Sequence, residues 1–204
     1  MSRLPSEAAR AACFLALSVA ALAGCRDGVT PERLARADRL AAEWLTAGRT
    51  YGEQRYSPLN QIAPGNIQRL GLAWEASLES FDFGVEATPL VADGIMYFTQ
   101  PINDVVAADA KTGRVYWLYR HNLPADIKPC CGSVNRGVAV AGDRVFYGTL
   151  DGQLIALDAK TGKHLWHYQT GGSHTASPIS YAIGGRQYVA LTAGNVLYSF
   201  TLPE

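Results

Sequence analysis

The pattern of apolar and polar positions divides the chain into three stretches. An apolar run from Ala11 to Ala23 follows a basic start and is too short to cross a bilayer as a mature helix. Behind the potential capping residue Thr30, apolar residues recur at helical spacing and predict a short amphipathic helix over Pro31–Trp44. From Trp74 onward, short apolar runs separated by Gly, Asp and Asn predict strands and hairpins.

The first stretch is typical of an export signal. It ends in Leu22-Ala23-Gly24-Cys25, which resembles the lipobox of bacterial lipoproteins, where the cysteine is lipidated and becomes the first mature residue. We therefore expect residues 1–24 to be a lipoprotein signal peptide and Cys25 to attach the protein to a membrane. With Arg26 next to it, the expected location is the periplasmic side of the outer membrane or the cell surface. The alternative is a plain secretory signal in which Cys25 is incidental, and it also places the chain outside the cytoplasm.

The β-rich stretch contains an internal repeat. The eleven residues that begin at Ala107 return from Ala156, 49 positions later, with the shared pattern Ala-x-Asp-x-x-Thr-Gly-x-x-x-Trp. Each copy reads as a strand, a tight turn in which Asp109 or Asp158 accepts hydrogen bonds, and a second strand carrying a tryptophan that can pack between units. Those tryptophans, with one before the repeats, are Trp74, Trp117 and Trp166.

The strands before each copy repeat as well, and a third echo begins at Ala176. The spacing suits one four-stranded propeller blade. The expected fold is therefore all-β: a partial β-propeller of about three blades over residues 71–204, after a helix and turn-rich lead-in over residues 25–70. The alternative is an unrelated β-sandwich whose similarity between segments is accidental.

Composition and charge narrow the possible partners and sites. Lys and Arg together number 18, as do Asp and Glu, and no basic cluster occurs, so nucleic acid is not an expected partner. The four histidines show no metal-ligand spacing and read as surface or structural residues. With Cys13 removed in the signal and Cys25 lipidated, the adjacent pair Cys130 and Cys131 remains, in a compartment where thiols tend to pair.

These motifs together carry a family resemblance. The repeat is similar to the tryptophan-docking motif of the pyrroloquinoline quinone (PQQ)-dependent, or quinoprotein, alcohol dehydrogenases of the methanol and ethanol dehydrogenase type. Gly48-Arg49-Thr50-Tyr51-Gly52-Glu53 departs from their usual Thr-Tyr-Gly-Gly. Further segments that resemble the family are Glu43-Trp44, Arg55 to Ile62, Pro129-Cys130-Cys131 with Val134 to Gly137, and Gly194 to Pro203.

That resemblance implies a propeller of about eight blades with PQQ on its axis, of which the middle is missing here. An amino-terminal third looks joined to a carboxyl-terminal end near Thr170-Gly171. In the family, the middle blades supply the calcium or lanthanide ligands and the catalytic Asp. No such motif can be placed in this chain, so we assign neither a catalytic residue nor a metal ligand.

The resemblance also implies a cofactor wall. Cys130 and Cys131 would form a vicinal disulfide lying against PQQ, Glu86 would hydrogen-bond the quinone, and Arg136 would meet the cofactor's acidic groups. The alternatives are two reduced, buried thiols, a solvated turn residue at Glu86 and a surface ion pair at Arg136.

Two functions are then open. One is a truncated quinoprotein alcohol dehydrogenase-like lipoprotein that is inactive alone. The other is a non-catalytic scaffold or binding lipoprotein of the envelope built from the same repeats, and a gene product without function is a third reading. In each case open blade edges predict self-association.

Overall fold

A computed structural model describes residues 28–78, 84–129, 132–174 and 176–203. The predicted signal peptide, Cys25, Cys130 and Cys131 lie outside these ranges. No helix within the described part of the chain is long and apolar enough to cross a membrane. The helical elements are α1 (Pro31–Ala35) and the 3-10 turns η1 (Ala37–Arg39), η2 (Ile67–Arg69) and η3 (Pro101–Asn103).

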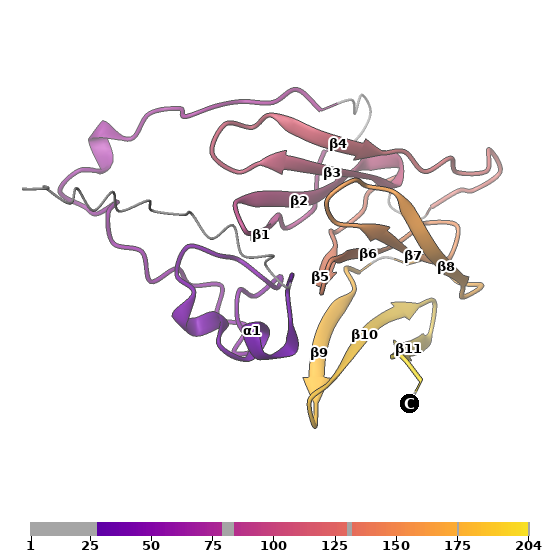
Figure 1. Ribbon diagram of the computed structural model, residues 1–204. Helices are drawn as coiled ribbons and strands as arrows, with labels where there is room; N and C mark the ends of the chain where they lie inside the picture. The colour runs from indigo at the N-terminus through magenta and orange to yellow at the C-terminus, as the bar shows by residue number, and fades with distance from the viewer. Residues whose placement is uncertain (1–27, 79–83, 130–131, 175, 204) are drawn as a thin grey trace, which may run out of the picture.

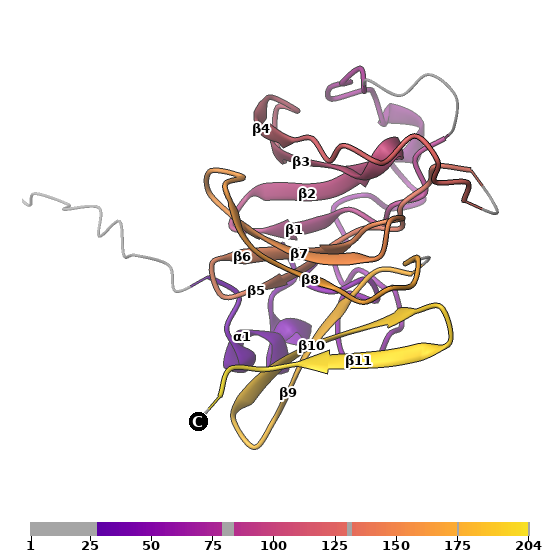
Figure 2. The ribbon, with the colours of Figure 1, turned by 90° about the vertical axis from the view of Figure 1, so that its right-hand side faces the viewer.

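The strands form three antiparallel sheets, stacked one on another (Figures 1 and 2). Sheets 1 and 2 have four strands in chain order, and sheet 3 has three, with β9 and β11 at its edges. The partial propeller of about three blades is therefore confirmed. Sheet 1 comprises β1 (Leu90–Ala92), β2 (Ile95–Gln100), β3 (Asp104–Asp109) and β4 (Val115–Tyr119); sheet 2 comprises β5 (Ala139–Ala141), β6 (Arg144–Gly148), β7 (Gln153–Asp158) and β8 (His164–Gln169); sheet 3 comprises β9 (Ile179–Ile183), β10 (Arg186–Ala193) and β11 (Val196–Phe200).

The repeated motif explains how neighbouring sheets join. The indole of Trp117, in β4, lies over Gly162, which stands in the β7–β8 turn at φ +71°. A Cβ at Gly162 would come within 2.7 Å of the indole, so only glycine allows this approach. The Trp117 indole nitrogen donates to the carbonyl of Ala159, 3.1 Å away. The expected packing of Trp117 between blades is confirmed.

Trp74 and Trp166 also pack on sheets, in different surroundings. Trp74 lies over Gly113 of the β3–β4 turn as Trp117 lies over Gly162, with 2.5 Å from a built Cβ to the indole. Trp166, in β8, meets the ring of Phe200 edge-on at 5.8 Å but stays 41% exposed. Sheet 3 therefore covers its tryptophan less completely than sheets 1 and 2 cover theirs.

The turn residues behave as expected. Oδ1 of Asp109 accepts from the backbone nitrogens of Lys111 and Thr112 at 2.9 and 2.8 Å, and Asp158 makes the same pair of contacts in the second copy. A hydrogen bond from the Tyr116 hydroxyl, and next in size one from Thr112, lower the pKa of Asp109 to about 2. Both carboxylates are thus turn acceptors.

The predicted helix over Pro31–Trp44 is wrong in length. Thr30 does cap α1, accepting from the nitrogen of Arg33 at 3.2 Å, but α1 ends at Ala35 and η1 ends at Arg39. Trp44 instead pairs with Val91 of β1 through two backbone hydrogen bonds of 2.9 Å. Pairing with an open strand edge satisfies backbone groups that a longer helix would satisfy internally, and here the pairing prevails.

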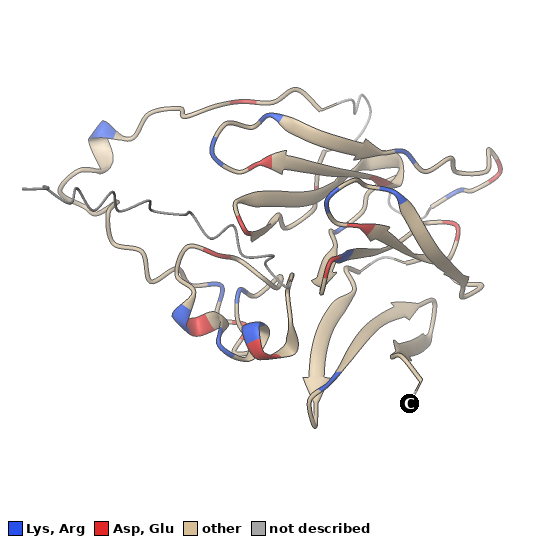
Figure 3. Cartoon of the chain, viewed as in Figure 1, with Lys and Arg blue, Asp and Glu red and all other residues tan. Residues whose placement is uncertain are grey.

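The N-terminal segment, residues 28–53, packs on the inner strands of sheets 1 and 2. Val29 bridges Gly142 just beyond β5, and Leu34 and Leu45 are buried in the same core cluster as β1, β3 and β7. Acidic and basic residues are frequent on this segment and at strand ends, whereas sheet 3 has few of them (Figure 3).

Candidate functional site

Glu86 and Arg136 are brought together at the entrances of two neighbouring sheets. Glu86 precedes β1 and Arg136 precedes β5. Nε and Nη2 of Arg136 each lie 3.3 Å from Oε2 of Glu86, although the residues are 50 positions apart. Both side chains remain about half exposed, at 52% and 47%. The two predicted cofactor residues are therefore neighbours, and their contact is an ion pair.

Three sheet entrances converge on the backbone of Arg136. Its carbonyl accepts from the nitrogen of Thr88 at 3.4 Å and from the hydroxyl of Ser177, which stands before β9 as Thr88 stands before β1. Gly137 follows at φ +123°, where a Cβ would lie 3.3 Å from both Ser177 Oγ and the Thr88 carbonyl. Only glycine fits this conformation and this close approach. These contacts fix the position of the backbone from which the Arg136 side chain extends.

Asn135 anchors the backbone next to Arg136 through buried hydrogen bonds. Its buried amide nitrogen donates to Oδ1 of Asn103 at 3.0 Å and to the carbonyl of Gly148 at 2.7 Å, while its Oδ1 accepts from the nitrogen of Gly137 at 3.1 Å. The hydroxyl of Thr99 donates to the Asn135 carbonyl at 3.2 Å. Sequence reasoning did not single out Asn135, because its partners come from η3 and β6 and no local spacing reveals them.

The neighbourhood of the cysteine pair is partly described. The nitrogen of Ile102, in η3, donates to the carbonyl of Ser133 at 2.9 Å, so the chain two residues after Cys131 is attached next to Asn103. The amide nitrogen of Asn103 is buried without a hydrogen-bond partner among the described residues. Cys130 and Cys131 themselves lie outside those residues, and the disulfide stays a prediction.

The histidines have structural surroundings. Nε2 of His121 lies 3.0 Å from Asp151, and the buried ring of His174 contacts the Thr192 carbonyl at 2.9 Å and the Thr170 hydroxyl at 3.2 Å. Burial lowers the pKa of His174. His164 and His167 are exposed neighbours with ring centroids 5.3 Å apart. Within the described ranges, no three His, Cys, Asp or Glu side chains gather as metal ligands would.

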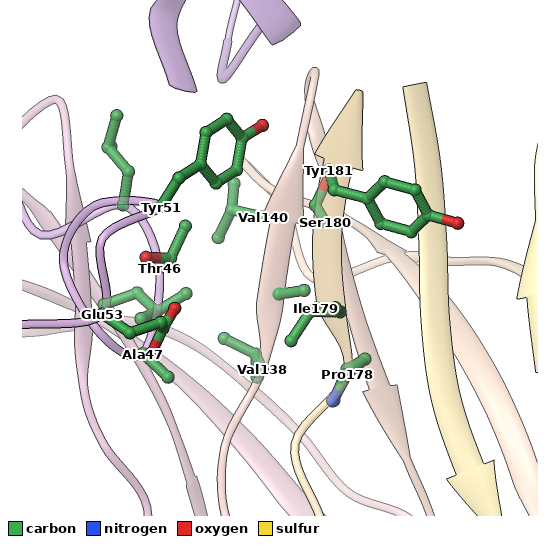
Figure 4. A pocket seen from close by; sticks show the side chains of 13 residues that line it. Thr46, Ala47, Tyr51, Glu53, Val138, Val140, Pro178, Ile179, Ser180 and Tyr181 are labelled. Atoms are coloured by element: carbon green, nitrogen blue, oxygen red, sulfur yellow. The ribbon is translucent and has the colours of Figure 1, made fainter. Parts of the chain in front are cut away.

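An apolar cavity of about 80 Å³ lies between the N-terminal segment and the inner strands (Figure 4). Leu45, Thr46 and Tyr51 line one side, and β1, β5 and β9 line the other. Burial raises the pKa of Tyr51. This volume is far below the about 300 Å³ at which small-molecule sites begin. Neither Glu86 nor Arg136 lines it.

The described residues fit one edge of PQQ and do not form a complete site. A guanidinium suits a carboxylate of the cofactor, and Glu86 offers acceptors to its polar edge. A cofactor pocket, however, buries about 70–90% of its ligand, whereas this pair is half exposed and already bonded to itself. The pair can supply a wall for a planar anion. No redox step can be derived from it.

Comparison with known proteins points to one family. A family model named PQQ matches residues 44–164 and 126–189 of this chain. It describes the β-propeller domain of glucose/ethanol/alcohol dehydrogenases. Quinohemoprotein alcohol dehydrogenase ADH-IIG of Pseudomonas putida is 44% identical over 163 residues, which are 76% of this chain and 22% of that protein. The dehydrogenase subunit of alcohol dehydrogenase (quinone) of Komagataeibacter europaeus is 47% identical over 132 residues, 64% of this chain and 18% of that subunit.

Solved structures agree. The solved structure of quinohemoprotein alcohol dehydrogenase ADHIIG from Pseudomonas putida superposes with a TM-score of 0.71 and 40% identity, over 82% of this chain and 26% of that one. A europium-containing methanol dehydrogenase gives a TM-score of 0.72 and 32% identity, over 83% of this chain and 32% of that one. The chain thus spans about a fifth of the length of the curated relatives it matches.

Proposed function

Because the chain belongs to the PQQ-type glucose/ethanol/alcohol dehydrogenase β-propeller family, we propose that it is a truncated, lipid-anchored quinoprotein alcohol dehydrogenase that keeps one wall of the PQQ site and does not oxidise alcohols alone. The observation that carries this proposal is the Glu86–Arg136 pair, held where three sheet entrances meet. The family reaction is alcohol oxidation with electrons passed to PQQ, and bound PQQ would supply the electron-accepting chemistry.

The set of catalytic groups among the described residues is incomplete, which supports the proposed lack of activity. The described residues include no metal-ligand cluster, and the carboxylates that the repeat presents, Asp109 and Asp158, are occupied by turn hydrogen bonds. The ligands of a calcium or lanthanide ion, and a general base, would therefore have to come from residues other than these.

The binding test is a PQQ titration of the full chain, followed by the cofactor's absorbance or by protein fluorescence. We expect weak binding that Arg136→Gln lowers about tenfold or more, because the change removes the cation facing the cofactor's carboxylates. Arg144→Gln is the matched control, since Arg144 also forms an exposed ion pair, with Asp143 at 2.8 Å, but lies in β6 away from the sheet entrances. No saturable binding, or equal losses in both variants, would refute the cofactor wall.

The activity test is dye-coupled alcohol oxidation by the same preparation, with PQQ and with calcium or lanthanide. We expect no rate above a protein-free background. A robust PQQ-dependent rate with an alcohol would refute the proposed inactivity while leaving the family assignment intact.

The second candidate function, a non-catalytic scaffold or binding lipoprotein of the envelope, is supported by the Leu22-Ala23-Gly24-Cys25 lipobox. An absence of PQQ binding together with stable accumulation in membranes would favour it. Immunoblotting of native membranes distinguishes both candidates from a product that scarcely accumulates.

A further inference from the structure

Among the described residues, sheet 3 has three strands, whereas sheets 1 and 2 each have four. The strand pairings show that β11 corresponds to β3 and β7. In each sheet, the second-strand residue that pairs with the first residue of the inner strand (β1, β5 or β9) also pairs with one residue of the third strand. That third-strand residue is Ala107 in sheet 1, Ala156 in sheet 2 and Ser199 in sheet 3. In sheets 1 and 2 the third strand has a further neighbour, whereas β11 is an edge among the described residues. The difference shows in exposure, because Leu197 of β11 is 71% exposed while its equivalents Val105 and Leu154 are both 0% exposed.

The edge of β11 is unprotected. Natural edge strands are commonly guarded by charges, prolines or bulges, and β11, with the sequence Val-Leu-Tyr-Ser-Phe, has none of them. Figure 3 shows that β11 contains no acidic or basic residue. Such an edge is suited to accept another strand.

The chain also contains a segment that takes the position of a fourth strand without belonging to a sheet. Residues 71–78 belong to no sheet, and Leu72 is 80% exposed. Trp74 nevertheless lies on Gly113 of sheet 1 as Trp117 of β4 lies on Gly162 of sheet 2. Tryptophan is the third residue of both β4 and β8, so residues 72–76 occupy the place of the fourth strand in a sheet preceding sheet 1.

The segment cannot complete sheet 3 of its own chain while Trp74 rests on Gly113. Tryptophan docking runs from each sheet to the next, so residues 72–76 lie on the side of sheet 1 that faces away from sheet 2. Sheet 3 lies beyond sheet 2, at the other end of the stack (Figure 2). The strand donor and the open acceptor edge therefore stand at opposite ends of one chain.

We propose that two copies of this chain exchange these segments, residues 72–76 of each pairing antiparallel with β11 of the other. By the register of β4 on β3 and of β8 on β7, Trp74 would face Ser199 of the other copy, Glu75 would face Tyr198, and Ala76 would face Leu197. With the three described sheets of each copy, two reciprocal exchanges give a closed ring of six sheets, within the about 4–8 blades usual for propellers. Three copies would exceed that range.

The register is testable by disulfide trapping. Directly opposed residues of an antiparallel pair have Cα atoms about 4.5–5.5 Å apart, within disulfide reach. Ala76→Cys with Leu197→Cys should give a covalent two-chain species on non-reducing gels, above the background from the chain's own cysteines. The matched control is Glu75→Cys with Leu197→Cys, because Glu75 would point to the opposite face. Equal cross-linking in both double variants would overturn the proposed register.

Association itself is tested on the full chain, extracted in mild detergent, by native mass spectrometry. We expect the mass of two chains, and Leu197→Lys should raise the dissociation constant at least about tenfold by placing a charge where the equivalent residues are buried. Val196→Lys is the matched control, because its equivalents Asp104 and Gln153 are polar and partly exposed. A wild-type chain that is monomeric at micromolar concentration, or equal losses in both variants, would overturn the proposal. These readouts do not involve PQQ, so they fail or succeed independently of the proposed function.

Discussion

A contact between an indole and a glycine marks both the interface of sheets 1 and 2 and the place where Trp74 packs on sheet 1. Gly113 and Gly162 have almost the same positive φ, 74° and 71°, and each sits beneath an indole. The Thr-Gly of the repeat is thus required twice over, once for the turn and once for the close approach of the tryptophan. Arg136 depends in the same way on Gly137, which lets Thr88 and Ser177 reach the arginine carbonyl.

We predict that Gly162→Ala destabilises the fold more than a positive φ alone explains. Alanine at such a φ costs about 1 kcal/mol, and the Cβ would add about 1–3 kcal/mol by colliding with Trp117. Gly184→Ala measures the cost of the positive φ alone, because Gly184 has a φ of 59° and a built Cβ there meets nothing within 4 Å. The difference between the two variants is then the cost of the collision with Trp117. Urea unfolding midpoints measure both variants. Equal shifts would show that the tryptophan contact contributes little.

At the scale of elements, the N-terminal segment acts as a clamp on the inner strands. Arg33 is its central contact: the guanidinium binds both Asp93 oxygens at 2.9 Å, the carboxylate of Glu43, and the carbonyl of Gly28 at 2.9 Å. Asp93 lies in the β1–β2 turn, so these bonds join α1 to sheet 1. They raise the pKa of Arg33, with Asp93 as the largest cause.

Removing that clamp should release the segment. We expect Arg33→Met to lower the free energy of unfolding by about 2 kcal/mol, because the charge-assisted hydrogen bonds of the guanidinium to Asp93 and Glu43 are lost. Limited proteolysis should then cut within residues 28–53 faster than in the parent protein. Arg36→Met is the control, since exposed Arg36 makes one backbone contact, at 3.2 Å to Glu32. Unchanged proteolysis of the Arg33 variant would argue against the clamp.

At the scale of the whole molecule, the protein is a stack of sheets with different exposures at its two ends. β8, β9 and β11 carry most of the exposed large apolar residues of the sheets, including Leu165, Ile183 and Leu197. A closed propeller would cover such faces, because each blade packs on two neighbours. The exposed ends therefore favour association, and membrane attachment would raise the local concentration of the copies.

The membrane anchor is predicted from sequence. We expect the full chain to fractionate with membranes and Cys25→Ala to release it in soluble form, because the lipid would be its attachment. Mass spectrometry of the mature N-terminus checks the modification directly, and Cys13→Ala serves as the control because that residue would be removed with the signal. A Cys25 variant that still partitions fully with membranes would contradict the anchor.

The sequence by itself determined the repeat, the all-β class and the tryptophan docking, because these depend on turn chemistry and spacing within each copy. It also predicted the cap at Thr30 and the acceptor role of Asp109 and Asp158, which bond to residues two and three positions away. Local interactions of this kind leave a local signature.

Only the tertiary structure decided what depends on distant partners. The helix expected to reach Trp44 ends early because the open edge of β1 offers Trp44 two backbone hydrogen bonds, and no helical periodicity can show that edge. The Glu86–Arg136 pair and the buried contacts of Asn135 likewise join residues that are far apart in the chain. The exposure of β11 follows from which strands and sheets lie beside it, and that is a property of the assembled stack of sheets.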